Sequence, residues 1–171
     1  IEARVVGRRP IGRFVAVARG DIGVLLGDTP PAQQLFELGS EQNLPGYRDK
    51  EFAGTRAAVL RGLLQYNTKY LQRPLRIGRL FLPAIAPAVS VGLQGGWTEL
   101  PTVSALAAVT RLGMRRDSAG VLVPVSRATN GGRASMTAGM RFLAGSIFVG
   151  GTRPVDRPAP WKFLVSFGQQ W

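Results

Sequence analysis

The sequence predicts an all-β protein built from antiparallel strands, and three observations support this fold class. Apolar and polar residues alternate with a period of two in several segments of about ten residues, as in strands with one apolar face. Two short segments of turn-forming residues, 9–12 and 144–145, separate neighbouring alternating segments. Only residues 103–112 have a pattern that would suit an amphipathic helix. We therefore expect consecutive strands joined by hairpin turns and a few longer loops.

The alternation is clearest in residues 133–143, where Met140 and Phe142 share one face and Arg133 and Arg141 share the other. A helix would instead need apolar residues spaced by three and four positions. Roughly seven segments have a comparable pattern, so we expect about seven strands. In chain order they are residues 2–8, 14–22, 56–70, 77–96, 133–143, 146–155 and 161–171. The prolines of the fourth segment should lie at an end, an edge or a bulge of its strand.

The composition excludes most familiar enzymes. The 171 residues include no Cys and no His, which removes disulfides, thiolate and imidazole metal sites, and histidine-dependent catalytic triads. No phosphate-binding loop is present, and the ten acidic residues are scattered singly. We therefore predict no enzyme, no cofactor, and no catalytic or metal-binding residue. The hydrophobic content of 45% excludes a disordered basic tail.

The two longest expected connections, residues 28–54 and 98–132, are rich in Gly, Pro and charge and are too long for hairpin loops. Short turns on one side of a sheet and long loops on the other are typical of an outer-membrane β-barrel. A soluble all-β sandwich or barrel fits the alternation alone equally well, because its strands also have one apolar face.

Three further features favour an antiparallel transmembrane β-barrel over a soluble domain. The expected strands reach about ten or more residues, which is enough to cross a bilayer, whereas the longest apolar stretch, residues 80–93, is too short for a spanning helix. Aromatic residues lie near strand ends, as at membrane interfaces: Tyr66, Tyr70, Trp97, Trp161 and Trp171. Arginines recur on the polar faces, where a water-filled lumen could solvate them: Arg4, Arg8, Arg19, Arg61, Arg133 and Arg141.

The net charge of +12 could also indicate a nucleic-acid-binding protein. The arginines, however, are spread one or two per strand, and no aromatic RNA-binding motif or helix-turn-helix is visible. We therefore expect the basic residues to face a lumen or anionic lipid headgroups, and we expect no nucleic acid.

Residues 34–54 read QLFELGSEQNLPGYRDKEFAG. This segment resembles the lumen loop of the bacterial surface antigen family, the superfamily of outer-membrane protein assembly factors and two-partner-secretion transporters. The positions that match in order and approximate spacing are Phe36, Leu38, Gly39, Gly46, Tyr47 and Gly54. The last strand is also similar to the C-terminal signal that the barrel-assembly machinery reads, through Phe163, Val165, Phe167 and Trp171.

The sequence departs from the family at the loop tip. The tip reads Leu44, Pro45, Gly46, Tyr47, with Pro45 where the family has an arginine. The family's arginine is expected to pair with an aspartate on the inner barrel wall, in a strand resembling residues 89–97, which contain no acid. Loss of both partners is self-consistent, because one buried charge alone would cost several kcal/mol. Arg48 is an alternative cation for this role.

The resemblance implies that residues 1–171 are the C-terminal part of a larger, sixteen-stranded barrel in the outer membrane of a Gram-negative bacterium. It implies a role in inserting outer-membrane proteins or translocating a polypeptide. The implied partners are outer-membrane lipid, the barrel-assembly machinery, and an unfolded outer-membrane or secreted polypeptide. Two alternatives are a passive barrel, serving as a channel or as the membrane anchor of an N-terminal domain, and a soluble basic all-β binding domain.

Overall fold

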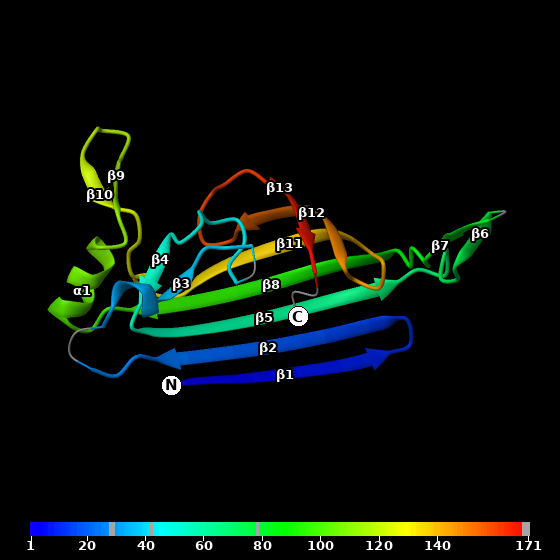
Figure 1. The fold of residues 1–171 in the computed structure, drawn as a ribbon, viewed down its shortest axis with the longest axis horizontal. Helices are drawn as coiled ribbons and strands as arrows, with labels where there is room; N and C mark the ends of the chain where they lie inside the picture. The colour runs from blue at the N-terminus through cyan, green and yellow to red at the C-terminus, as the bar shows by residue number, and fades with distance from the viewer. Residues whose placement is uncertain (28–29, 42, 78, 169–171) are drawn as a thin grey trace.

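A computed structural model of the chain describes residues 1–27, 30–41, 43–77 and 79–168. Its main element is a seven-stranded antiparallel sheet in the order β1-β2-β5-β8-β11-β12-β13 (Figure 1). The strands are β1 (Glu2–Ile11), β2 (Phe14–Val24), β5 (Arg56–Asn67), β8 (Ala88–Glu99), β11 (Arg133–Phe142), β12 (Ile147–Pro154) and β13 (Lys162–Phe167). The predicted all-β class and the antiparallel pairing of about seven strands are thereby confirmed. Within the described residues the sheet is open, with β1 and β13 at its edges.

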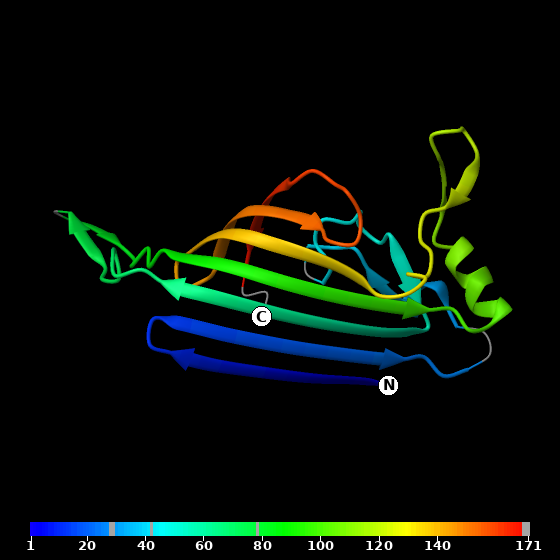
Figure 2. The same ribbon diagram turned by 180° about the vertical axis from the view of Figure 1, so that it is seen from behind.

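One predicted strand is wrong in its first half. The fourth strand begins at Ala88 rather than at residue 77, and β6 (Leu75–Ile77) and β7 (Leu80–Leu82) form a separate small hairpin. Pro83 and Pro87 lie in the irregular segment between this hairpin and β8, because proline has no N–H to donate to a ladder. As a result, a connection of residues 68–87 lies at the same end of the sheet as the two short turns (Figure 2). The expectation that the long connections all lie at one end is therefore wrong, because the long connections between β2 and β5 and between β8 and β11 lie at the opposite end.

The two predicted long connections contain their own short elements. Between β2 and β5 lie η1 (Ala32–Gln34), β3 (Phe36–Leu38) and β4 (Phe52–Gly54), and the last two pair with each other. Between β8 and β11 lie α1 (Val103–Thr110), which is the predicted helix, and the hairpin of β9 (Met114–Arg116) with β10 (Leu122–Pro124). Ala108 and Val109 of α1 pack on Leu35 and Ala53, so the two connections share one apolar cluster. Among the described helices, none has the length and apolarity needed to cross a bilayer.

The two faces of the sheet have opposite character. We call the face carrying Arg19, Arg61, Gln94 and Ser135 the inner face, because these residues lie side by side in register. Thr152 of β12 is opposite Thr137 and lies on the same face. The other face, the outer face, exposes large apolar side chains. They include Val5, Ile22, Leu60, Leu64, Val89, Val91, Leu93, Met140, Phe163 and Phe167.

Strand β8 shows this arrangement most clearly. Its even-numbered residues from Ala88 to Thr98 are buried on the inner face, while Val89, Val91 and Leu93 are about half exposed on the outer face. On β11 and β5, Arg141 and Arg61 are only 5% exposed. Polar residues are thus covered and apolar residues are uncovered, which is the reverse of a soluble β-sandwich with an apolar core.

Candidate functional site

The most elaborate feature of the inner face is the loop segment of residues 35–54, which we call the inner loop. It begins beside β2, where the ring of Phe36 lies directly over Gly23 in space that a side chain at position 23 would fill. It continues over β8, where a Cβ on Gly96 would lie 2.9 Å from Leu38 Cδ1 and 3.5 Å from Leu44 Cδ2. Two glycines of the sheet therefore provide the room in which the loop side chains lie.

The tip of the inner loop reaches the far side of the sheet. Gly46 has a φ of 95°, and a Cβ there would lie 3.0 Å from the carbonyl carbon of Arg153, at the end of β12. The Gly46 carbonyl accepts a hydrogen bond from Lys162 Nζ of β13 at 2.8 Å. The loop thus contacts strands from β2 to the edge strand β13, and only glycine suits the close approach at its tip.

An apolar cluster holds the loop in shape. Leu38, Leu44, Tyr47 and Phe52 are buried together, with Val59 of β5 packed against them. The rings of Tyr47 and Phe52 meet edge to face with their centroids 5.3 Å apart. Full burial of residues as large as Leu44 and Phe52 contributes about 1.5–3 kcal/mol each.

Asn43 closes the turn that leads into the loop tip. Its Oδ1 accepts hydrogen bonds from the backbone N–H groups of Gly39 and Ser40 at 3.1 and 3.0 Å, and its Nδ2 donates to the Glu37 carbonyl at 2.8 Å. Gly39 has a φ of 112°, with the Arg48 carbonyl where a Cβ would lie. Gly54 is similarly enclosed, because a Cβ there would lie 2.6 Å from the backbone oxygen of Glu99. Glycine is therefore required at these two positions of the motif, because neighbouring backbone atoms lie where a Cβ would be.

Glu51 forms the first part of an ionic network between the inner loop and the connection that joins β12 to β13. Its carboxylate accepts two hydrogen bonds from Arg157, at 3.1 and 3.2 Å, and one from the backbone N–H of Arg48 at 3.1 Å. Arg127 lies 3.4 Å away. Burial alone would raise the pKa of the Glu51 carboxyl, but the Arg157 and Arg48 hydrogen bonds bring it below its ordinary value.

Tyr47 forms the second part of the network. Its hydroxyl donates a hydrogen bond to Asp156 and lies 3.1 Å from the Ala134 carbonyl oxygen, and the Arg157 guanidinium lies 4.6 Å from its ring centroid. Asp156 also accepts from Arg133 at 2.8 Å. Burial and the Asp156 contact raise the pKa of Tyr47 above its ordinary value. The pKa of Asp156 is lowered, because the Tyr47 and Arg133 bonds outweigh its partial burial.

Eight of the nine loop residues singled out from the sequence are buried or half-buried beside the inner face, and Arg48 is the exposed exception. Pro45 is buried at the tip. Residues 89–97, the segment compared with the family's wall strand, belong to β8 and place the buried Ser90 and Gln94 on the inner face. Gln94 Nε2 donates a hydrogen bond to Thr137 Oγ1 at 3.2 Å. The polar contacts of the loop with the far side of the sheet come from Tyr47, Glu51 and the Gly46 carbonyl instead of a tip arginine.

At the C-terminus, Phe163 and Phe167 are 79% and 76% exposed on the outer face, and Val165 is half-buried there. Trp171 lies outside the described residues. Sequence reasoning missed Glu51, Asp156, Arg157 and Lys162 as contact residues. Tyr47 and Asp156 are 109 positions apart, and no motif spacing links them.

Comparison of the chain with models of known protein families gives no match, and a search of curated proteins finds no significantly similar sequence. Any function proposed for the chain therefore depends on the geometry of the sheet and on the loop resemblance.

Proposed function

We propose that this chain forms part of an outer-membrane β-barrel of a Gram-negative bacterium, and that the barrel assists insertion of outer-membrane proteins or translocation of a polypeptide. The observation that carries the proposal is the reversed polarity of the sheet, with apolar side chains exposed outside and buried arginines inside. Acyl chains would cover the outer face, and water in a lumen would solvate the inner face.

The strand lengths support this placement. Strands β2, β5, β8 and β11 have 11, 12, 12 and 10 residues. A tilted strand of about 9–11 residues crosses the hydrocarbon core of a bilayer. The exposed Phe163 and Phe167 of β13 suit the same lipid-facing row.

The open edges of the sheet require further strands in a membrane. Unpaired backbone groups of β1 and β13 would each cost several kcal/mol in hydrocarbon. We therefore propose that the seven strands are part of a larger barrel, closed by strands that pair with the free edges. If the seam at β13 is weak, an incoming substrate strand can pair there by strand addition.

The inner loop gives this edge a second support. Gly46 packs on the end of β12 and accepts a hydrogen bond from Lys162 of β13, while Phe36 lies over β2 at the other end of the loop. A displacement of the loop tip would therefore remove contacts from the edge strand. This is a physical route by which the loop could control strand exchange at the seam.

A passive barrel is the second candidate. The inner face contains arginines around a cavity of about 620 Å³, and a basic polar lining would suit an ion channel. Conductance without assembly activity would favour this candidate.

The test uses the whole barrel that contains this chain, expressed in its own membrane and then purified in detergent. A folded barrel should sediment with the outer membrane, resist extraction, and change gel mobility on heating. Proteoliposomes containing it should accelerate folding of an unfolded outer-membrane protein above the rate in empty vesicles. A chain that purifies as a monomer without detergent would refute the membrane assignment and favour a soluble domain. Membrane insertion without acceleration of folding or translocation would refute the assembly role alone.

A further inference from the structure

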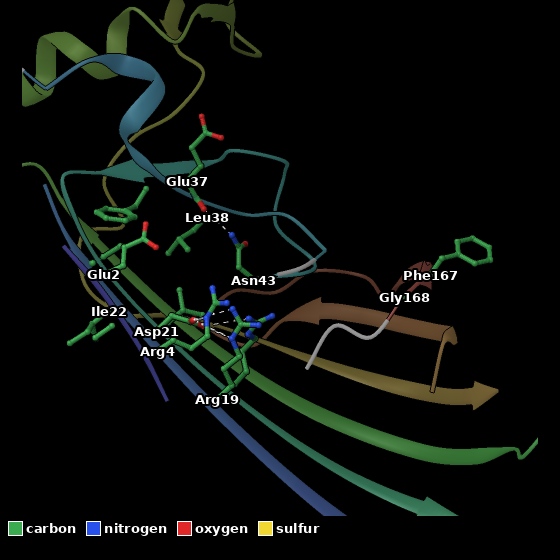
Figure 3. Close-up of a pocket in the computed structure, with 16 residues that line it drawn as sticks. Glu2, Arg4, Arg19, Asp21, Ile22, Glu37, Leu38, Asn43, Phe167 and Gly168 are labelled. Carbon is green, nitrogen blue, oxygen red and sulfur yellow. Dashed lines mark hydrogen bonds and ion pairs between the residues drawn. The ribbon is translucent and has the colours of Figure 1, made fainter. Parts of the chain in front are cut away.

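A cavity of about 620 Å³ lies between the inner loop and strands β1, β2 and β5, with Phe167 and Gly168 at the end of β13 also in its lining. Figure 3 shows the side chains of Arg4 and Arg19 converging on Asp21 at this cavity. The strand register brings these groups together, because Arg4 is directly opposite Asp21 and Arg19 is directly opposite Arg61. All four side chains lie on the inner face.

One carboxylate is shared by three guanidinium groups. Asp21 lies 2.5 Å from Arg4 Nε, 2.8 Å from Arg19 Nε and 3.4 Å from an Arg61 Nη atom. Like charges directly opposite each other on neighbouring strands repel, as Arg19 and Arg61 do here. A single negative charge cannot balance three positive charges, and Arg61 is only 5% exposed to water.

Two other acids line the cavity but are placed differently. The Glu37 carboxylate points away from the arginines in Figure 3 and pairs with Lys50 Nζ at 2.9 Å. Glu2 is opposite Gly23, on the same face of β1 as Arg4, so three guanidinium groups face two carboxylates when it is counted. The cluster around Asp21 therefore has a local excess of positive charge.

We propose that this cavity binds an oxyanion, a phosphate or sulfate group, between Arg4, Arg19 and Arg61. Planar guanidinium groups match the oxygens of such anions through charge-assisted, often bidentate hydrogen bonds. The volume is within the range of small-ligand pockets, so the group can carry a small substituent. The ligand is a soluble phosphate compound or the phosphate of a lipid headgroup. The inference uses the inner-face geometry and does not require the assembly role proposed above.

Calorimetric titration with inorganic phosphate tests the proposal, using the whole barrel that contains this chain, folded in non-ionic detergent at constant ionic strength. We expect saturable binding by the wild type. Arg4→Gln should weaken it about tenfold by removing a charge-assisted donor. The Arg4 side chain is 60% exposed, so this variant should keep its fold. Arg76→Gln, an exposed arginine on β6 at the other end of the sheet, is the matched control and should bind like the wild type.

A second variant tests the same site through stability. Asp21→Asn removes the internal anion, so phosphate should raise its melting temperature more than it raises that of the wild type. The proposal is overturned if the wild type shows no saturable binding, or if Arg4→Gln and Arg76→Gln weaken binding equally.

Micelles of a short-chain phosphatidic acid distinguish the two sources. Arg4-dependent displacement of phosphate by the lipid supports a headgroup ligand, and intact phosphate binding without displacement supports a soluble one. The proposed site is overturned if the protein does not bind phosphate and if its lipid binding is unchanged by Arg4→Gln and by added phosphate.

Discussion

Placing a charge on the outer face should distinguish a lipid-facing surface from a water-facing one, and Leu60 is the best position for this test. Leu60 is in the middle part of β5 and is 67% exposed. Its directly opposite neighbours on β2 and β8 are Gly20 and Gly95, so the side chain has little packing to lose. Any large effect of Leu60→Arg must therefore come from what covers the outer face.

The two environments predict different magnitudes. In water, a surface substitution at such a position changes stability by about 0.5 kcal/mol or less. On the lipid face of a barrel, an arginine near the bilayer midplane costs about 2–4 kcal/mol, which is roughly a 30- to 1,000-fold change in the folded-to-unfolded ratio. Gln65→Arg is the matched control, because Gln65 is a half-buried residue on the inner face of the same strand.

Urea unfolding in phospholipid vesicles, followed by tryptophan fluorescence and by heat-modifiable gel mobility, measures both variants. We expect a large loss of stability for Leu60→Arg and a change within about 1 kcal/mol for Gln65→Arg. Equal, small effects of the two variants would show that water, not lipid, covers the outer face.

Three further predictions concern the inner loop. Gly54→Ala should lower the free energy of unfolding by about 1–3 kcal/mol, because the new Cβ would meet a backbone oxygen. Gly62→Ala is the control: its new Cβ would lie 3.9 Å from the nearest atom, so the free energy of unfolding should change little in the same urea assay. Tyr47→Phe should cost about 1–2 kcal/mol and raise the pKa of Asp156, which carbon-detected NMR titration can follow; an unchanged pKa would contradict the hydrogen bond. The folded-state pKa values of Glu51 and Asp156 lie below their ordinary values of 4.5 and 3.8. The stability that these two carboxylates contribute is therefore fully present above pH 4.5. It is lost as the pH falls through their folded-state pKa values. Glu51→Gln should therefore flatten the acid limb of a stability–pH curve, and an unaltered limb would exclude Glu51 from the network.

The sheet could be predicted from the sequence because alternation reports directly on which face of a strand is apolar. Six of the seven expected strands lie within a few residues of the observed ones, and Met140 and Arg141 face the sides that their parity indicated. The segment before Ala88 could not be predicted in the same way, because its prolines interrupt an apolar run that still resembles a strand. The ionic network was also beyond prediction, because loop-to-loop pairing leaves no periodic signal.

The inner loop is attached by two kinds of contact that respond differently to solution conditions. Phe36, Leu38 and Leu44 lie against β2 and β8 through apolar packing, which salt and moderate acid leave largely unchanged. Tyr47 and Glu51 contact the far side through charged partners that titrate and are partly screened, since the Arg157 side chain is 40% exposed. Because the ionic contacts involve the connection that leads into the edge strand, we predict that acid or salt weakens the loop at this side before it weakens the packing on β8. Selective loosening of that kind would suit the proposed barrel, whose seam opens sideways.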